Sequence, residues 1–165
     1  MCKACIFPFE THGYTFFHCD SITKAGGVGA YFKNTLDAKH LQELSRSFDG
    51  CESLWIEVGR TKKMSLLELS IDTPIRTWMS SKKLYANPSW IEKNMYVMRD
   101  FHIDLLKSSN NHVLDFVNLT NCFGWRNLIN KPTRVTKETH TSLDHILYMQ
   151  MTLSIEWTQA CVSRI

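Results

Sequence analysis

The sequence has little that would prevent a chain from packing into one compact core. Only four of its 165 residues are proline and seven are glycine, and charged residues make up 21%. This composition excludes a disordered or collagen-like chain. Hydrophobic residues make up 44% of the chain, and a chain of this length buries roughly 70% of its unfolded surface. We therefore expect a single domain over residues 1–165.

Long hydrophobic runs and a strong excess of one charge are also missing. No apolar run approaches the roughly 20 residues of a membrane-spanning helix, and the first residues show no basic region followed by a long apolar stretch. The formal net charge of +3 is too small to indicate nucleic acid binding by itself. We expect a soluble, intracellular monomer without a membrane partner.

The cysteines show no complete pattern of disulfide or metal-binding spacings. Without a secretory signal, the six thiols are expected to be reduced. Cys2 and Cys5, with His12, His18 and Cys19 downstream, have the residue types of a zinc site. A second closely spaced ligand pair is missing. A small zinc-dependent binding module is therefore kept as an alternative function.

Short stretches rich in aromatic and β-branched residues are mixed with helix-like segments. Lys82–Lys93 predicts a helix interrupted by Pro88, and Asn110–Cys122 predicts an amphipathic helix capped by Ser109 or Asn110. Strands are predicted at Tyr14–His18, Gly27–Lys33, Ser53–Val58, Leu66–Ile71, Met95–Met98 and Leu143–Tyr148. This mixture indicates an α/β domain.

Two carboxylates and a histidine follow the predicted strand Met95–Met98. These are Asp100, His102 and Asp104. A carboxylate at the end of a buried strand is well placed to bind a metal ion or activate water, because the sheet holds it rigidly. Asp100 or Asp104 could equally cap a turn. The residues of this segment alone leave both interpretations open.

Several blocks of sequence in a consistent order carry a resemblance to a known family. They are VMRDFHIDLLK (97–107), FGWRNLINKPTRVT (123–136) and THTSLDHILY (139–148), preceded by GYTFFHCDSITKAGGVGAYFKN (13–34) and CESLWIEV (51–58). These blocks resemble the endonuclease domains of non-LTR retrotransposons, which belong to the endonuclease/exonuclease/phosphatase superfamily. The resemblance covers residues 13–148, apart from a gap near residues 68–81. It implies a partial four-layer α/β sandwich that hydrolyses phosphodiester bonds in DNA with a divalent cation, usually Mg²⁺.

The resemblance also implies roles for individual residues. Asp100 matches the water-activating aspartate of the family's Gly-Asp-Phe-Asn motif, in which Arg99 replaces the glycine and His102 the asparagine. Arg99 thus stands where the backbone of the motif can need φ > 0 or a close approach. The imidazole of His102 differs in reach and charge from an amide. Asp144 matches the aspartate that supports a catalytic histidine in this superfamily.

A basic segment precedes Asp144 in the sequence. The resemblance implies that Lys131, Arg134 and Lys137 contact the DNA backbone, and a solvated surface is the alternative interpretation. His145 follows Asp144 and should face the opposite side of its strand, in the core. Trp55, Phe116 and Trp125 are predicted to pack in the core rather than to stack on bases.

Some groups that the family uses have no counterpart in the sequence. These are a metal-binding glutamate before Gly13, an asparagine on the first strand and a later Ser-Asp-His motif. We therefore assign no metal ligand and expect Mg²⁺ not to be bound stably. Losing even one group that stabilises transition-state charge commonly costs about 10²-fold in rate. The preferred function is a remnant of a DNA-nicking endonuclease, inactive and at most weakly DNA-binding. The alternative is an active Mg²⁺-dependent endonuclease with Asp100 as the base.

Two stretches resemble the family better in another reading frame. Read one nucleotide earlier, with suitable codons, residues 68–81 give GAIYRHPYTNLDEF and residues 151–165 give NDTIHRVDTGVCISD. We hypothesise a decayed retrotransposon copy, which the codons of the DNA would test. In the present frame Glu68 would face a covered side of the sheet, and burying a lone carboxylate costs several kcal/mol. Local loosening or a rearranged sheet edge is therefore expected there.

Overall fold

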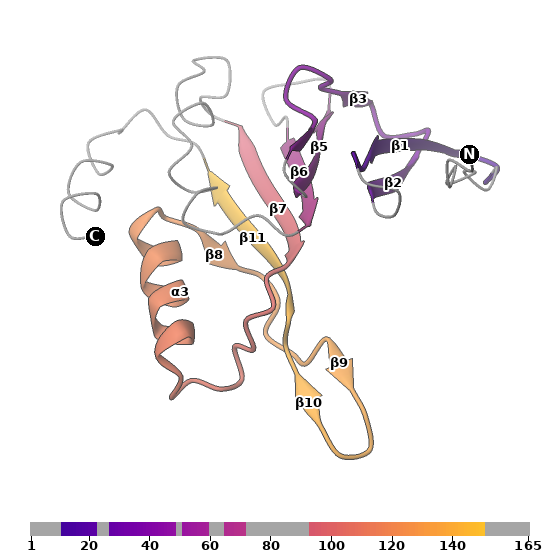
Figure 1. Ribbon diagram of the computed structural model, residues 1–165. Helices are drawn as coiled ribbons and strands as arrows, with labels where there is room; N and C mark the ends of the chain where they lie inside the picture. Colours follow the sequence, from indigo (N-terminus) through magenta and orange to yellow (C-terminus); the bar gives the residue numbers. More distant parts are fainter. Residues whose placement is uncertain (1–10, 23–26, 49–50, 60–64, 72–92, 151–165) are drawn as a thin grey trace.

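The computed structural model describes residues 11–22, 27–48, 51–59, 65–71 and 93–150. In these ranges the chain forms a mixed sheet, one α-helix and two separate hairpins (Figure 1). The sheet contains β3 (Ala38–His40), β4 (Arg46–Phe48), β5 (Cys51–Val58), β6 (Ser65–Ile71), β7 (Asn94–Asp100), β8 (Arg126–Asn127) and β11 (Asp144–Gln150). The remaining elements are β1 (Tyr14–Asp20), β2 (Gly27–Lys33), α3 (Asn111–Cys122), β9 (Arg134–Val135) and β10 (His140–Thr141).

The sheet has the strand order β3-β5-β6-β7-β11-β8, and β4 also pairs with β5. β6 and β7 are parallel, and the other pairs are antiparallel. Figure 1 shows α3 beside one face of the sheet and the β1–β2 hairpin on the other side. The β9–β10 hairpin extends from the end of the sheet where β7 stops and β11 starts. The α/β prediction is confirmed.

The predicted strands and helix recur with small shifts at their ends. The structure lengthens most of the predicted strands by one to three residues and reproduces Gly27–Lys33 without change. Asn110 is the N-cap of α3, and its side chain accepts a hydrogen bond from the backbone N–H of His112. The helix predicted over Lys82–Lys93 lies outside the described residues, apart from Lys93. Within the described ranges, no helix is long and apolar enough to cross a membrane.

The main core lies between α3 and the sheet. Trp55, Phe116 and Trp125 are between 1% and 4% exposed, so their predicted packing role is confirmed. The core cluster comprises Leu41, Trp55, Met95, Val97, Phe116, Phe123, Trp125, Leu147 and Met149. Alternate residues of β7 and β11 enter this core, which leaves the residues between them on the opposite face, toward the β1–β2 hairpin.

Two expectations from the sequence need correction. The backbone of β6 pairs on both sides, so residues 68–71 do not form a sheet edge, while the loosening expected over residues 68–81 stays a prediction because residues 72–81 lie outside the described residues. Backbone ladders join β6 to β5 and β7, and the Cα of Glu68 pairs with those of Trp55 and Val97. Cys122 is disulfide-bonded, against the expectation of reduced thiols, while Cys19 is a free thiol. Sequence spacing does not reveal which sulfur atoms the fold brings together.

The alternative reading frame is tested by the coding DNA and not by the structure. Residues 68–71 form the end of β6. Residues 72–81 and 151–165 lie outside the described residues. The out-of-frame hypothesis therefore remains a prediction about codons.

Candidate functional site

Two carboxylates meet where β7 ends and β11 begins. Asp100 is the last residue of β7 and Asp144 the first of β11, and their Cα atoms are direct partners in the antiparallel register. Residues opposite each other in a sheet point to the same face. Both carboxylates line a cavity of about 330 Å³, together with Val28 of β2 and Ile129. The sheet thus brings together two of the three predicted catalytic residues.

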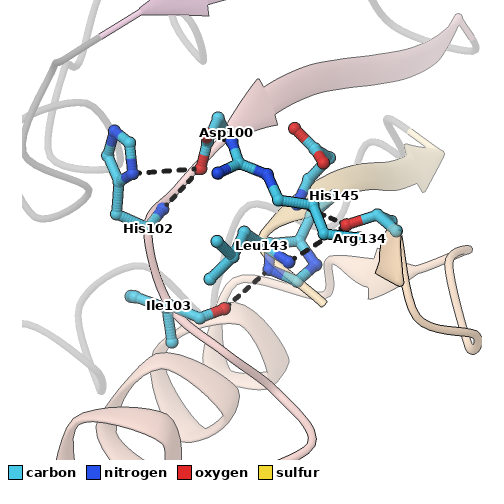
Figure 2. Close-up of polar contacts among 8 residues, drawn as sticks. Asp100, His102, Ile103, Arg134, Leu143 and His145 are labelled. Atoms are coloured by element: carbon cyan, nitrogen blue, oxygen red, sulfur yellow. Dashed lines mark hydrogen bonds and ion pairs between the residues drawn. The ribbon is translucent and has the colours of Figure 1, made fainter. Parts of the chain in front are cut away.

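Both oxygen atoms of Asp100 already accept hydrogen bonds from the protein (Figure 2). Oδ1 accepts from the backbone N–H of His102 at 2.9 Å, and Nδ1 of the same histidine lies 3.4 Å away. Oδ2 accepts from Nη2 of Arg134 at 2.9 Å. Asp100 therefore caps a turn through one oxygen and forms an ion pair through the other. All three predicted catalytic residues and Arg134 lie within this one edge of the sheet.

His102 has a left-handed backbone conformation. Its φ angle of 54° lies in the region where asparagine, aspartate and histidine are several times more common than most other residues. The conformation therefore suits both the asparagine that the resemblance expects at this position and the histidine that replaces it. At Arg99, the expected need for φ > 0 is wrong, because Arg99 pairs regularly with His145 in the sheet. Its buried guanidinium lies 5.2 Å from the centre of the Phe101 ring.

The three predicted DNA-contacting residues lie along one exposed segment. The hydroxyl of Thr133 accepts hydrogen bonds from the backbone N–H groups of Leu143 and Asp144, at 3.2 and 3.3 Å. These bonds fix the base of the β9–β10 hairpin beside the start of β11. Lys131 precedes the hairpin and Lys137 lies in its turn, both with exposed side chains. Arg134 alone of the three is placed against Asp100.

Asp104 connects the loop after β7 to the chain before β11. Its Oδ1 accepts hydrogen bonds from the backbone N–H groups of Ser142 at 2.9 Å and Leu106 at 3.3 Å. The hydrogen bond from Ser142 is the main cause that lowers the pKa of Asp104 below its ordinary value. The side chain is only 10% exposed. Asp104 therefore has a structural role, and the turn-capping interpretation is confirmed for it.

His145 lies on the face of β11 opposite Asp144, as predicted. It is 1% exposed and packs between the rings of Phe101 and Phe116. Nε2 donates to the carbonyl oxygen of Ile103 at 3.0 Å, and Nδ1 lies 3.4 Å from the amide nitrogen of Asn127. Burial lowers the pKa of His145. This pattern corresponds to a neutral core imidazole that holds the same loop as Asp104.

Similarity to solved structures identifies the fold. The endonuclease domain of TRAS1, a telomere-specific non-LTR retrotransposon, matches with a TM-score of 0.60 and 12% identity, over 88% of this chain and 70% of that one. A humanized TDP2 from D. rerio matches with a TM-score of 0.55 and 13% identity, over 86% of this chain and 63% of that one. D. rerio TDP2 complexed with a single-strand DNA product matches with a TM-score of 0.50 and 10% identity, over 84% and 63%.

The chain has the endonuclease/exonuclease/phosphatase fold. The family resemblance drawn from the sequence blocks is thereby confirmed at the level of the fold. The chain spans less than two thirds of the length of the TDP2 chains. Neither a protein-family model nor a curated protein matches the sequence.

The described residues do not fit the divalent cation that the endonuclease/exonuclease/phosphatase fold implies. No three His, Cys, Asp or Glu side chains among them gather into a possible metal site. Asp100 and Asp144 could supply carboxylate oxygens, which Mg²⁺ prefers. However, the guanidinium of Arg134 lies against Oδ2 of Asp100 and places a positive charge where a cation would approach. The contact of Arg134 with Asp100 thus opposes the binding of a cation at that oxygen.

The zinc alternative depends on residues at the start of the chain. Cys2 and Cys5 lie outside the described residues. Nδ1 of His18 lies 3.0 Å from a carboxylate oxygen of Asp20. Cys19 is the neighbour of His18 in β1, so its side chain points to the opposite face of that strand. His18 and Cys19 are therefore poorly placed to bind one ion together.

Glu52 is a site-facing residue that the sequence reasoning missed. It is 4% exposed and pairs with Ile71 of β6. The residue before Ile71 pairs with Arg99 of β7, so Ile71 lies level with Asp100. Glu52 therefore lies in the row of the sheet that carries Asp100, two strands away, which is about 9–10 Å between backbones. Burial, and then the charge of Glu52, raise the pKa of the Cys19 thiol. No motif signals this placement, because it depends on the register of three strands.

Proposed function

We propose that this chain is a remnant of a retrotransposon endonuclease domain that keeps contacts to nucleic acid phosphates and has lost phosphodiester cleavage. The similar TRAS1 structure is an endonuclease domain, and a similar TDP2 structure contains a single-strand DNA product. These likenesses support nucleic acid as the ligand class. We include in the proposal a four-layer sandwich, to which the described residues contribute three consecutive layers: α3, the sheet and the β1–β2 hairpin (Figure 1).

The loss of cleavage is supported by the contacts of Asp100. A carboxylate that orients an attacking water must accept a hydrogen bond from that water. Both oxygens of Asp100 already accept from protein groups, the backbone of His102 and the side chain of Arg134, so an attacking water would have to share the carboxylate with them. The same guanidinium opposes the cation that would neutralise charge on the phosphate. Stable Mg²⁺ binding is therefore not expected.

The retained phosphate contacts are supported by the hairpin segment. Lys131, Arg134 and Lys137 lie within seven residues and are all exposed. Cationic side chains on an exposed segment contact the phosphate backbone without reading bases. Binding is therefore expected to be weak, independent of sequence and sensitive to salt.

A plasmid nicking assay tests the loss of cleavage. We expect the protein with Mg²⁺ to convert no more supercoiled plasmid to the nicked form than the Asp100→Ala variant does. Asp115→Ala, at an exposed position of α3, is the matched control for removing a carboxylate. Nicking by the wild type that disappears in Asp100→Ala and persists in Asp115→Ala would show an active Mg²⁺-dependent endonuclease and overturn the proposal.

A further inference from the structure

We propose that Arg134 exchanges partners when nucleic acid binds, leaving the carboxylate of Asp100 for a backbone phosphate. Asp100 then acts as an internal competitor of the phosphate, so the protein binds nucleic acid less tightly because of this residue. The inference rests on the proposed function, since it assumes that nucleic acid is the ligand. It adds a specific role for the ion pair at the sheet edge.

The ion pair is accessible enough to be exchanged. Arg134 Nη2 and Asp100 Oδ2 lie 2.9 Å apart, and their side chains are 56% and 26% exposed. Ion pairs exposed to this degree contribute little to folding stability, so breaking one costs little. The backbone near Arg134 stays in place, because Thr133 holds the chain through its hydrogen bonds with Leu143 and Asp144. The side chain can therefore turn outward without moving the hairpin.

A phosphate is a suitable replacement partner for the guanidinium. Arginine presents parallel N–H groups that match phosphate as well as carboxylate. Lys131 and Lys137 flank Arg134 in the sequence, and both have exposed side chains. A bound backbone would therefore meet three cationic groups along one segment, whereas Asp100 offers one carboxylate. Figure 2 shows the guanidinium of Arg134 beside the carboxylate of Asp100.

The exchange predicts an unusual result for Asp100→Asn. Removing the charge of Asp100 releases Arg134, so the variant should bind nucleic acid about twofold to fivefold more tightly than wild type. Asp144→Asn removes the same charge from the facing residue of the register, which has no ion pair with Arg134 among the described contacts. It is the matched control, and its effect should be clearly smaller.

The experiment measures anisotropy of a fluorescent single-stranded oligonucleotide at low salt with EDTA. Besides the tightening by Asp100→Asn, we expect Arg134→Ala to weaken binding about threefold to tenfold. The slope of the logarithm of the binding constant against the logarithm of the salt concentration should become shallower by about one. In the Arg134→Ala background, Asp100→Asn and Asp144→Asn should have equal effects. Lys137→Ala should weaken binding while leaving the tightening by Asp100→Asn unchanged. Arg134→Gln and thermal unfolding of every variant guard against a folding defect.

Two results would overturn the exchange. One is equal tightening by Asp100→Asn and Asp144→Asn in the wild-type background. The other is wild-type binding weaker than about 10⁻⁴ M, the upper limit of ordinary non-specific affinity. Because the titration contains no divalent cation, it is independent of cleavage. Nicking with Mg²⁺ would overturn the proposed function while leaving the exchange intact.

Discussion

Replacing Asp104 by alanine is expected to lower the free energy of unfolding by about 2–4 kcal/mol, because two charge-assisted hydrogen bonds are lost. Ser142 is 3% exposed, so its backbone N–H would be left buried without its acceptor. The neighbouring contact, from the N–H of Leu105 to the carbonyl of Ser142 at 3.2 Å, would weaken with it. The loop that positions Asp100 against Asp144 would then lose part of its anchor.

Urea denaturation monitored by tryptophan fluorescence measures this loss, because Trp125 lies in the core. Asp104→Asn keeps an oxygen that can accept both hydrogen bonds, so it should cost clearly less than Asp104→Ala. Asp115→Ala, at an exposed helix position, should stay within about 0.5 kcal/mol of wild type. Equal stabilities of Asp104→Ala and Asp115→Ala would contradict the structural role of Asp104.

Replacing His145 by alanine is expected to lower the free energy of unfolding by about 3 kcal/mol, because it opens a cavity and removes a buried hydrogen bond. The side chain is 1% exposed, and the carbonyl of Ile103 would lose its imidazole donor, while the amide of Asn127 would keep only its hydrogen bond to the carbonyl of Ile129. His145→Gln can keep a donor toward Ile103 and should cost less. A loss below about 1 kcal/mol in His145→Ala would show that the imidazole is not part of the core.

The pH dependence of stability provides a second measurement on His145. Its pKa is lowered by burial from an ordinary value of 6.5. At a pH between the lowered pKa of the folded protein and the ordinary pKa of 6.5, the unfolded chain binds a proton at His145 that the folded protein does not. The free energy of unfolding therefore falls as the pH drops below 6.5. The slope from this one group is at most about 1.4 kcal/mol per pH unit. His145→Gln should show a shallower decline between pH 6.5 and 5 than wild type.

Two other groups, His40 and Asp104, contribute to the pH dependence of stability, and their effects can be distinguished from that of His145. Burial also lowers the pKa of His40, and this contribution is present in both wild type and His145→Gln. It therefore cancels in their difference. The stabilising contribution of Asp104, whose pKa is lowered from 3.8, is present above that pH and lost as the pH falls below it. Identical pH curves for wild type and His145→Gln would contradict the buried neutral imidazole.

The sequence by itself determined the local elements. The aromatic and β-branched runs predicted the strands because their side chains suit a pleated, half-buried surface. Asn110 predicted the start of α3 because its side chain satisfies a helix N–H group that has no other partner. Period-two alternation also placed Asp144 and His145 on opposite faces of β11, and the structure confirms it.

Only the tertiary structure decided how these parts form a site. The register of β7 and β11 places Asp100 opposite Asp144, and the register of β5, β6 and β7 brings Glu52 into the same row. The hairpin places Arg134 on Asp100, a contact between residues 34 positions apart. Strand register and hairpin position depend on contacts between distant residues, which local preference does not encode. The sequence thus identified Asp100, Asp144 and Arg134 as site residues, whereas the fold added Glu52 and decided that Asp100 faces a guanidinium.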